Sequence, residues 1–299
     1  MKPEIALIGP GKVGCAVGRR LHLAGYPISA VIGRTQEQAA DACRFIGCAP
    51  AAASNQLAAA SKAKIILLTV KDDQISNLAK ELHRLKKLSS DQTLIHFSGL
   101  KPASAMLSPS SETETISIHP LLPFADREIA IRALQNCPCA YEGSPARHHL
   151  AIELIAAFGG QAFPIEPEQK ALYHASASIA SNFLVTLLAT SEELLKSCGI
   201  PTDQAIPLIM PLVRATLDNV EKVGTEQGLT GPIVRGDQST ITAHLTALQD
   251  ASPQIDTLYR HLGIETVNLA NKSGRLAVEY AKKLKEILAS KRDRETTVF

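Results

Sequence analysis

The segment Gly9-Pro10-Gly11-Lys12-Val13-Gly14 constrains this chain most, because three glycines at fixed spacing lie between two regular elements. The apolar run Ile5–Ile8 precedes it and is typical of a buried strand, and residues 13–23 follow with helical periodicity. A second apolar run, Ile28–Ile32, completes a strand–helix–strand unit. In such a unit the glycines permit a tight turn, a close approach of pyrophosphate and close helix–strand packing. The pattern therefore predicts a dinucleotide site at a helix N-terminus, where free N–H groups bind phosphate.

The residues after the second strand indicate which dinucleotide binds. An NAD site usually carries Asp or Glu about 20 residues after the glycines, whereas this chain reads Gly33-Arg34-Thr35. An arginine attracts a 2'-phosphate, and Thr35 can hydrogen-bond it. We therefore expect NADP(H) as the cofactor. The alternative is that Arg34 is a solvated loop residue and that Glu37 binds the ribose.

The order of the apolar segments predicts the fold class. Strand-like and helix-like segments alternate from residue 4 to residue 165, and the strands are short continuous apolar runs, as expected when helices cover both faces of a parallel sheet. After residue 167 the pattern is helical, apart from a candidate short strand at 264–267. We expect an α/β fold: a doubly wound, mostly parallel Rossmann sheet in residues 1–166, followed by an all-α domain in residues 167–299.

Residues that interrupt or end helices predict some details of the helical half. Residues 168–198 predict one long helix, and Pro207 and Pro211 predict that the next helix, 204–222, is kinked or begins late. The charged tail, 290–299, carries no cap and is expected to fray.

Composition narrows the class of protein. The 299 residues carry 31 basic and 29 acidic side chains, which gives no reason to expect binding to nucleic acid or to a membrane. The longest apolar runs have strand length, so we expect a cytoplasmic protein. Six cysteines lack paired spacing and are expected to be reduced thiols; Cys137-Pro138-Cys139 has no completing histidine cluster, and no metal site is expected.

Polar side chains follow three of the predicted strands. Thr69-Val70 ends one strand, Ser98-Gly99 follows the next and His119 ends a third. The carboxyl ends of parallel strands meet at one sheet edge, where ligands bind. We expect Thr69 and Val70 beside the cofactor and Ser98, Gly99 and His119 in a substrate pocket. Each also has a structural explanation, as a helix start, a turn or an extended strand exit.

A polar stripe lies on the predicted long helix. Lys170, His174, Ser178 and Asn182 recur every four residues and so share a slowly drifting face. Reduction of a carbonyl or imine needs a proton donor, and Lys170 or His174 can serve. We expect Ser178 to contact substrate. The alternative is a solvated flank with a structural histidine.

A loop in the helical half is the second unusual feature. Gly231, Pro232 and Gly236 fix the backbone around Arg235 and Asp237, and a rigid loop presenting an arginine suits a substrate carboxylate. The equally supported alternative is that Asp237 caps the following helix and Arg235 pairs with it.

The chain resembles a family of bacterial proteins with a Rossmann-like half and a C-terminal half of unassigned function, similar to the C-terminal domain of 6-phosphogluconate dehydrogenase. The resemblance covers nearly the whole chain. It is carried by five segments: Gly9 to Gly14, His96 to Gly99, His119-Pro120-Leu121, Tyr173-His174-Ala175 through Asn182, and Leu229 through Asp237. The wider superfamily includes β-hydroxyacid dehydrogenases, ketopantoate reductases and pyrroline-carboxylate reductases, which use NAD(P) on small acids.

The resemblance also implies roles. β-Hydroxyacid dehydrogenases carry a catalytic Lys followed four residues later by Asn; here Lys170 matches the Lys, and His174 stands in place of the Asn. Asn182 and Ser98 would then orient the substrate. The resemblance implies a homodimer built through the helical domains. We expect an NADPH-dependent reductase of a small carbonyl acid, such as a ketopantoate-like 2-oxo acid; the alternatives are a cyclic imine acid reductase and a non-catalytic NADP-binding regulatory protein.

Overall fold

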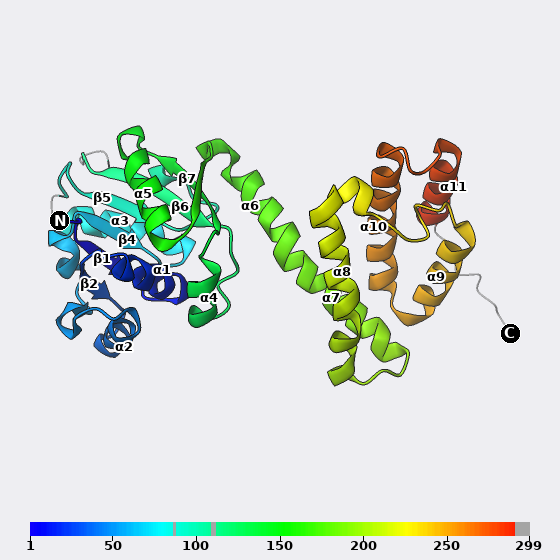
Figure 1. Cartoon of the computed structure of the whole chain (residues 1–299), viewed down its shortest axis with the longest axis horizontal. Helices are drawn as coiled ribbons and strands as arrows, with labels where there is room; N and C mark the ends of the chain where they lie inside the picture. The colour runs from blue at the N-terminus through cyan, green and yellow to red at the C-terminus, as the bar shows by residue number, and fades with distance from the viewer. Residues whose placement is uncertain (86–87, 109–111, 291–299) are drawn as a thin grey trace. The chain divides into compact units, whose positions relative to one another are not determined.

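An eight-stranded sheet forms the centre of the N-terminal half, in the order β3-β2-β1-β4-β5-β6-β7-β8 (Figure 1). Its strands are β1 (Ile5–Ile8), β2 (Ile28–Ile32), β3 (Ala53–Ser54), β4 (Ile65–Leu68), β5 (Thr93–His96), β6 (Glu114–Pro120), β7 (Pro138–Gly143) and β8 (Gln161–Pro164). All neighbours are parallel except β6 and β7, which are antiparallel. The strand order reverses between β1 and β4, which is the switch point where α/β sheets bind ligands. The predicted doubly wound, mostly parallel sheet is confirmed.

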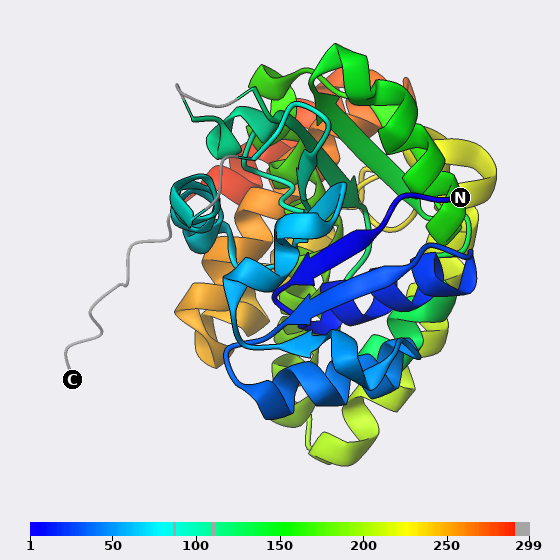
Figure 2. The ribbon, with the colours of Figure 1, turned by 90° about the vertical axis from the view of Figure 1, so that its left-hand side faces the viewer.

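Helices cover both faces of this sheet. They are α1 (Lys12–Leu23), α2 (Gln36–Ile46), α3 (Asp72–Leu85), α4 (Arg127–Ala133) and α5 (His148–Phe158), with 3-10 turns at η1 (Pro50–Ala52), η2 (Leu57–Lys62), η3 (Ala103–Met106), η4 (Pro145–Arg147) and η5 (Pro167–Gln169). Ile5 and Leu7 pack with α1, α2, α4 and α5, whereas Ala6 and Ile8 pack with α3 and η2. Figure 2 shows β1 and β2 side by side. Two-sided burial explains why the strands are continuous apolar runs.

From residue 167 to residue 290 the structure consists of helices and their connecting loops, as predicted. Its helices are α6 (Lys170–Ser178), the π-helical turn η6 (Ile179–Phe183), α7 (Leu184–Ser197), α8 (Thr202–Gly228), α9 (Gln238–Ala251), α10 (Pro253–Lys272) and α11 (Val278–Ala289). Helices α9, α10 and α11 pack around Ile241, Val267 and Leu284 (Figure 1). The short strand considered at 264–267 was wrong: Ile264 and Val267 lie three residues apart on α10 and face this core.

Two further expectations about the helices need correction. The predicted helix 168–198 is continuous in extent but contains the π turn η6, which inserts an extra residue into the helical register. Helix α8 passes through Pro207 and Pro211, and its non-helical residue is Gly224, with φ 78° and ψ 170°. The break thus lies at the glycine, which tolerates positive φ, and not at the prolines.

The structure is a computed structural model that describes residues 1–85, 88–108 and 112–290. The chain forms two compact units, Met1–Asn182 and Phe183–Phe299. The boundary predicted at residues 166 and 167 follows the last strand, whereas the first unit also includes α6. Residues 291–299, predicted to fray, lie outside the described residues.

One helical stretch, Pro167–Ser197, is long and apolar enough to cross a membrane by length and composition. Continuous apolar runs in the sequence do not reveal this helix, because Lys, His, Ser, Asn and Thr interrupt the stretch. Within this stretch only Lys170 is buried, and the other residues are exposed or half-buried along its whole length. It therefore also has the character of a helix that packs against another protein chain.

Candidate functional site

The three glycines of the first turn have three different surroundings. Gly9 has φ +87°, and a Cβ there would lie 2.6 Å from Cγ1 of Val70. A Cβ on Gly14 would overlap Oγ1 of Thr69 and lie 2.8 Å from the Gly9 carbonyl oxygen. Nothing lies within 4 Å of the Cβ position on Gly11. Gly9 and Gly14 are therefore needed by the protein itself, and Gly11 leaves open space that suits a cofactor phosphate.

Thr69 ties this turn to the neighbouring strand. Its hydroxyl donates to the carbonyl oxygens of Gly9 at 2.6 Å and Ile8 at 3.2 Å. The turn then leads into α1, whose N-cap is Gly11 and whose first helical residues are Lys12 and Val13. The N-terminus of α1 thus starts beside the ends of β1 and β4, where a helix dipole favours an anion.

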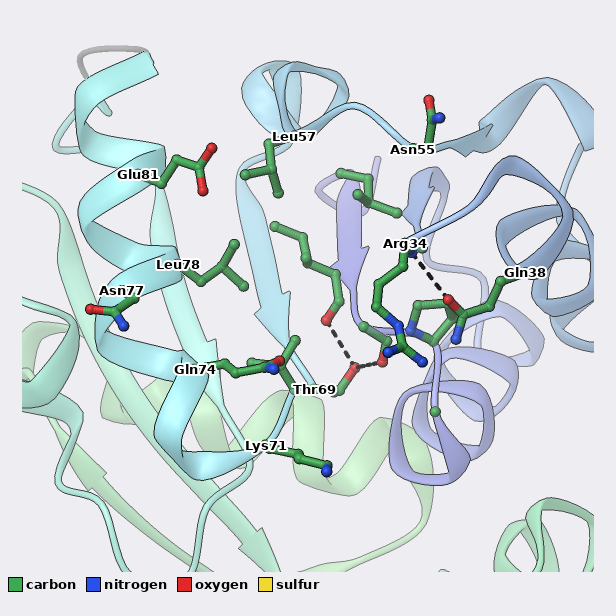
Figure 3. Close-up of a pocket in the computed structure, with 17 residues that line it drawn as sticks. Arg34, Gln38, Asn55, Leu57, Thr69, Lys71, Gln74, Asn77, Leu78 and Glu81 are labelled. Atoms are coloured by element: carbon green, nitrogen blue, oxygen red, sulfur yellow. Dashed lines mark hydrogen bonds between the residues drawn. The ribbon is translucent and has the colours of Figure 1, made fainter.

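A pocket of about 570 Å³ opens at this sheet edge. Its lining combines the turn with the ends of β2 and β4, the β3 loop and one side of α3: Ile8, Gly9, Pro10, Gly11, Ile32, Gly33, Arg34, Gln38, Asn55, Leu57, Thr69, Val70, Lys71, Gln74, Asn77, Leu78 and Glu81. Figure 3 shows these side chains around the pocket. The volume suits a small-molecule cofactor, and the open Cβ position on Gly11 gives its phosphates room.

Arg34 takes the position expected of a 2'-phosphate ligand. Its side chain is exposed and lines the pocket, while its backbone N–H donates to Oε1 of Gln38 at 3.1 Å (Figure 3). Thr35 is the N-cap of α2: its hydroxyl accepts a hydrogen bond from the Gln38 N–H at 3.1 Å. Neither Thr35 nor Glu37 is part of the pocket lining. The placement favours Arg34 over Glu37 for contact with the cofactor ribose.

Sequence reasoning missed the contribution of α3. Gln74, Asn77 and Glu81 line the pocket from one side of this helix, together with Lys71 just before it (Figure 3). Their spacing of three and four residues places them on one helix face. That spacing, directly after the strand that ends at Thr69, was the signal that could have identified them.

Ser98 organises the loop after β5. Its side chain is buried; the hydroxyl donates to Oδ2 of Asp72 at 2.6 Å and accepts from the N–H groups of Leu100 and Lys101 at 3.1 and 2.9 Å. Its carbonyl oxygen accepts from Oγ of Ser117 at 3.3 Å. These bonds are those of a turn, which is the structural explanation that the sequence analysis offered for Ser98. Ser98 therefore fixes the loop at the end of β5, and its contact with substrate stays a prediction.

Lys170 is only 2% exposed. Its Nζ donates to Oγ of Ser117 at 2.6 Å and to the Ser98 carbonyl oxygen at 3.2 Å, and pairs with Oε1 of Glu142 at 3.4 Å. Burial lowers the pKa of Lys170, and the nearby Glu142 carboxylate opposes that shift. An ammonium has three N–H donors, and here three protein oxygens accept them. This arrangement favours His174 over Lys170 among the two predicted proton donors.

His119, Tyr173 and His174 gather around Gly99. A Cβ on Gly99 would lie 2.5 Å from Cδ2 of His174 and 2.8 Å from Nε2 of His119. Nδ1 of His119 lies 2.9 Å from the Tyr173 hydroxyl, and the two imidazole centroids are 5.9 Å apart. Gly99 thus lets β6 and α6 bring their side chains together at the end of β5. The sequence analysis predicted no contact between Tyr173 and His119.

The other predicted residues lie at different places. Ser178 is half-buried at the end of α6, and Asn182 is exposed in η6. Asp237 is the N-cap of α9: its carboxylate accepts from the Thr240 N–H at 3.0 Å, and hydrogen bonds lower its pKa to about 2. Arg235 is exposed in the C-terminal unit, and its charge also lowers the Asp237 pKa. The capping alternative therefore describes Asp237, and its contact with substrate stays a prediction.

All six cysteines are thiols, and residues 1–85, 88–108 and 112–290 hold no cluster of three metal-ligating side chains.

Comparisons with known proteins agree with this geometry. Residues 4–98 match a family described as NADP oxidoreductase, coenzyme F420-dependent. Residues 137–266 match a domain of unknown function, DUF2520. The Rossmann half therefore resembles NADP oxidoreductases. The match confirms the expectation of an NADP-type cofactor and supports an oxidoreductase, and the second match agrees with a C-terminal half of unassigned function. No curated protein matches the chain.

Solved structures share the fold over nearly the whole length. Protein BF3122 from Bacteroides fragilis aligns with a TM-score of 0.70 and 22% identity, covering 90% of this chain and 98% of that chain. Protein TM1727 from Thermotoga maritima gives 0.62 and 23%, covering 95% and 98%. The 1-pyrroline-5-carboxylate reductase from Streptococcus pyogenes gives 0.62 and 16%, covering 95% and 99%. At these identities the likeness shows the fold alone.

Proposed function

We propose that this chain is an NADPH-dependent reductase of a small carbonyl acid, such as a ketopantoate-like 2-oxo acid. The observation that carries the proposal is a pocket that combines Arg34, the glycine turn and Thr69, in the same unit as a polar cluster at the ends of β5 and β6. Gly9, Pro10, Gly11, Thr69 and Val70 would hold the cofactor, with the 2'-phosphate on Arg34. When bound, NADPH supplies a hydride.

The chain's own residues then bind and orient the substrate. The imidazoles of His119 and His174 pack against Gly99 at the end of β5, where they would face the substrate. Ser98 fixes this loop through its bonds to Asp72 and to backbone N–H groups. Arg235 is exposed on a loop ordered by the Asp237 cap, and an arginine binds a carboxylate with two parallel hydrogen bonds. Ser178 and Asn182 would contact the substrate from the long helix.

A cyclic imine acid is the second candidate substrate. The solved structures that share the fold include pyrroline-carboxylate reductases and a reductive aminase from Aspergillus terreus in complex with NADPH, the latter with a TM-score of 0.59 and 14% identity over 96% of this chain and 93% of that chain. For an imine acid, NADPH would again supply the hydride, and Arg235 would again bind the substrate carboxylate.

The test is turnover by the purified chain. NADPH oxidation would be followed with ketopantoate, other branched 2-oxo acids and pyrroline-5-carboxylate, with NADH as the control cofactor. NADPH-selective turnover of a 2-oxo acid supports the proposal, and turnover of pyrroline-5-carboxylate alone selects the second candidate. If NADPH binds but no compound is reduced, the carbonyl and imine acid proposals fail and the non-catalytic NADP-binding alternative gains support.

Arg34→Ala is expected to weaken NADPH binding by about 10- to 100-fold, because a charge-assisted hydrogen bond contributes roughly 1.5–3 kcal/mol. NADH affinity should change little, since NADH lacks the 2'-phosphate. Titration calorimetry measures both. Arg44→Ala is the matched control, because Arg44 is exposed on α2, the helix that follows Arg34, but pairs with Asp41 and does not line the pocket. Equal NADPH affinity in Arg34→Ala and the wild type would contradict the assignment.

We also propose a homodimer through the helical half. Large apolar side chains are exposed on the long helix and on α8: Leu172, Ile179, Phe183, Val185, Leu208 and Leu212. Exposed apolar surface of this extent usually marks an interface. Sedimentation velocity is expected to give twice the chain mass of 32.0 kDa. A species of 32.0 kDa at micromolar concentration would contradict a stable dimer. The cytoplasmic location stays a prediction.

A further inference from the structure

The side chains around Gly99 form a linked pair and a separate neighbour. His119 at the end of β6 and Tyr173 on α6 share a hydrogen bond of 2.9 Å between Nδ1 and the phenol oxygen, and their rings meet edge to face. Phe163 of β8 packs against the other side of Tyr173, with centroids 6.1 Å apart. His174 lies beside His119, and no hydrogen bond joins these two imidazoles. The pair is thus held from two strands and one helix.

Both members of the pair are neutral at ordinary pH. Burial, with the charges of His174 and Lys170, lowers the pKa of His119 to about 4. Burial raises the pKa of Tyr173 to about 12. Between two neutral groups, a phenol is the better donor and an imidazole nitrogen the better acceptor. Tyr173 therefore donates to Nδ1, and the single ring proton of His119 lies on Nε2.

That proton is next to Gly99. Nε2 of His119 is the nitrogen that approaches the bare Cα of Gly99, at the strand end where the sheet edge presents its polar groups. His119 is partly exposed, whereas Lys170 is buried and its donors are already used. Within the cluster around Gly99, His119 is the imidazole whose Nδ1 shares a hydrogen bond with a phenol, which leaves its Nε2 to carry the ring proton.

We propose that His119 is the proton donor of the reduction, and that Tyr173 positions it and passes a proton to Nδ1 as Nε2 gives up its own. This inference rests on the proposed function and assigns to His119 the catalytic role that the sequence analysis predicted for Lys170 or His174.

The step balances in atoms and charge. The substrate carbon gains a C–H bond with the hydride, and the C=O π electrons move to oxygen. Oxygen forms an O–H bond with the Nε2 proton as that N–H bond breaks, and Nδ1 takes the Tyr173 proton at the same time. The tyrosinate left behind is half-buried. To restore the starting state, Nε2 takes a proton from water, which leaves hydroxide, and the Nδ1 proton returns to the Tyr173 oxygen. For an imine the same proton goes to nitrogen. NADPH is oxidised, and the carbonyl or imine is reduced.

The charged and titratable groups around His119 come from several elements. Asp72 at the start of α3 raises its pKa, and Lys170 and His174 on α6 lower it. Tyr173 completes the set. A neutral-imidazole donor predicts a rate that does not fall as pH rises through the ordinary histidine range near about 6.5. If the donor had to be a histidinium, the rate would fall as pH rises through that range.

The first experiment does not need turnover. Side-chain ¹⁵N spectra of the full chain, assigned with His119→Gln, report which imidazole nitrogen carries the proton. We expect the Nε2–H tautomer for His119, and a loss of that preference in Tyr173→Phe. An Nδ1–H tautomer in the wild type, or an unchanged tautomer in Tyr173→Phe, overturns the proposed pair whether or not a substrate has been found.

The second experiment uses whichever substrate the wild type reduces. His119→Gln is expected to lower kcat by about 10²- to 10⁴-fold, the usual contribution of general acid catalysis. NADPH affinity should stay unchanged. Tyr173→Phe should lower kcat less and change its pH profile, which a packing defect does not do. His244→Gln is the matched control and should retain most of kcat, because Nδ1 of His244 lies 2.8 Å from the Tyr259 hydroxyl in the C-terminal unit.

The outcomes separate the two proposals. If the wild type reduces no compound of the panel, the proposed function fails while the tautomer still decides the geometry of the pair. If the wild type is active and His174→Gln loses the rate while His119→Gln keeps it, the reductase stands and His119 is not the donor.

Discussion

Replacing Lys170 with methionine is expected to lower the free energy of unfolding of the N-terminal unit by about 3–5 kcal/mol, because it leaves a buried carboxylate without its counterion. Glu142 is 4% exposed, and its Oε1 also accepts from the Ala103 N–H at 2.8 Å. Methionine has a similar length but no donor for Ser98, Ser117 or Glu142. Urea unfolding followed by circular dichroism measures the change, since the chain contains no tryptophan.

Two controls identify the cause of this loss. Glu142→Gln in the Lys170→Met background removes the unpaired charge and keeps an acceptor for Ala103, so it should restore part of the lost stability. Lys64→Met breaks the exposed pair of Lys64 with Asp91 and should cost at most about 1 kcal/mol. Equal effects of Lys170→Met and Lys64→Met would show that the Lys170–Glu142 pair is not desolvated in solution.

Gly14→Ala is expected to damage both folding and cofactor binding. The new methyl group would overlap Oγ1 of Thr69 and lie 2.8 Å from the Gly9 carbonyl oxygen, the two groups that share the hydrogen bond of 2.6 Å. Overpacking of this kind costs about 1–3 kcal/mol. Because the collision displaces the turn that would face the phosphates, NADPH affinity should fall by at least about tenfold, or 1.4 kcal/mol.

Gly11→Ala is the matched control within the same turn. Its Cβ has nothing within 4 Å, and the Gly11 φ of −80° suits alanine. We therefore expect unchanged stability and weaker NADPH binding, because the methyl group would occupy the space left for pyrophosphate. Urea unfolding and calorimetric titration of the two variants separate protein packing from cofactor contact. Unchanged NADPH affinity in both variants would place the cofactor elsewhere.

The fold was predictable because its signals are local. A glycine turn between strand and helix, and apolar runs short enough to be strands, specify β1, α1 and β2 without knowledge of distant contacts. The prediction was wrong where a short apolar segment fits both a strand and a helix. Ile264 and Val267 resemble a short strand by composition, but they lie on one face of α10. The π turn at Ile179–Phe183 had no sequence signal that we used.

The site was predictable in part. Residues at strand ends were found because parallel strands bring their carboxyl ends to one edge, which places Thr69, Ser98 and His119 there. Periodicity also found the polar stripe on the long helix. It did not distinguish buried Lys170 from half-buried His174 and exposed Asn182, because a helix pattern does not say what packs against each turn.

The sequence by itself determined the parallel sheet, the glycine turn and the presence of Arg34 after the second strand, since each depends on residues close together in the chain. Only the tertiary structure decided what the polar side chains do. Lys170 reaches Ser98, 72 residues away, and His119 reaches Tyr173, 54 residues away. Burial, hydrogen bonding and pKa depend on such distant partners, so Lys170 becomes part of a buried ion pair and His119 shares a hydrogen bond with a tyrosine.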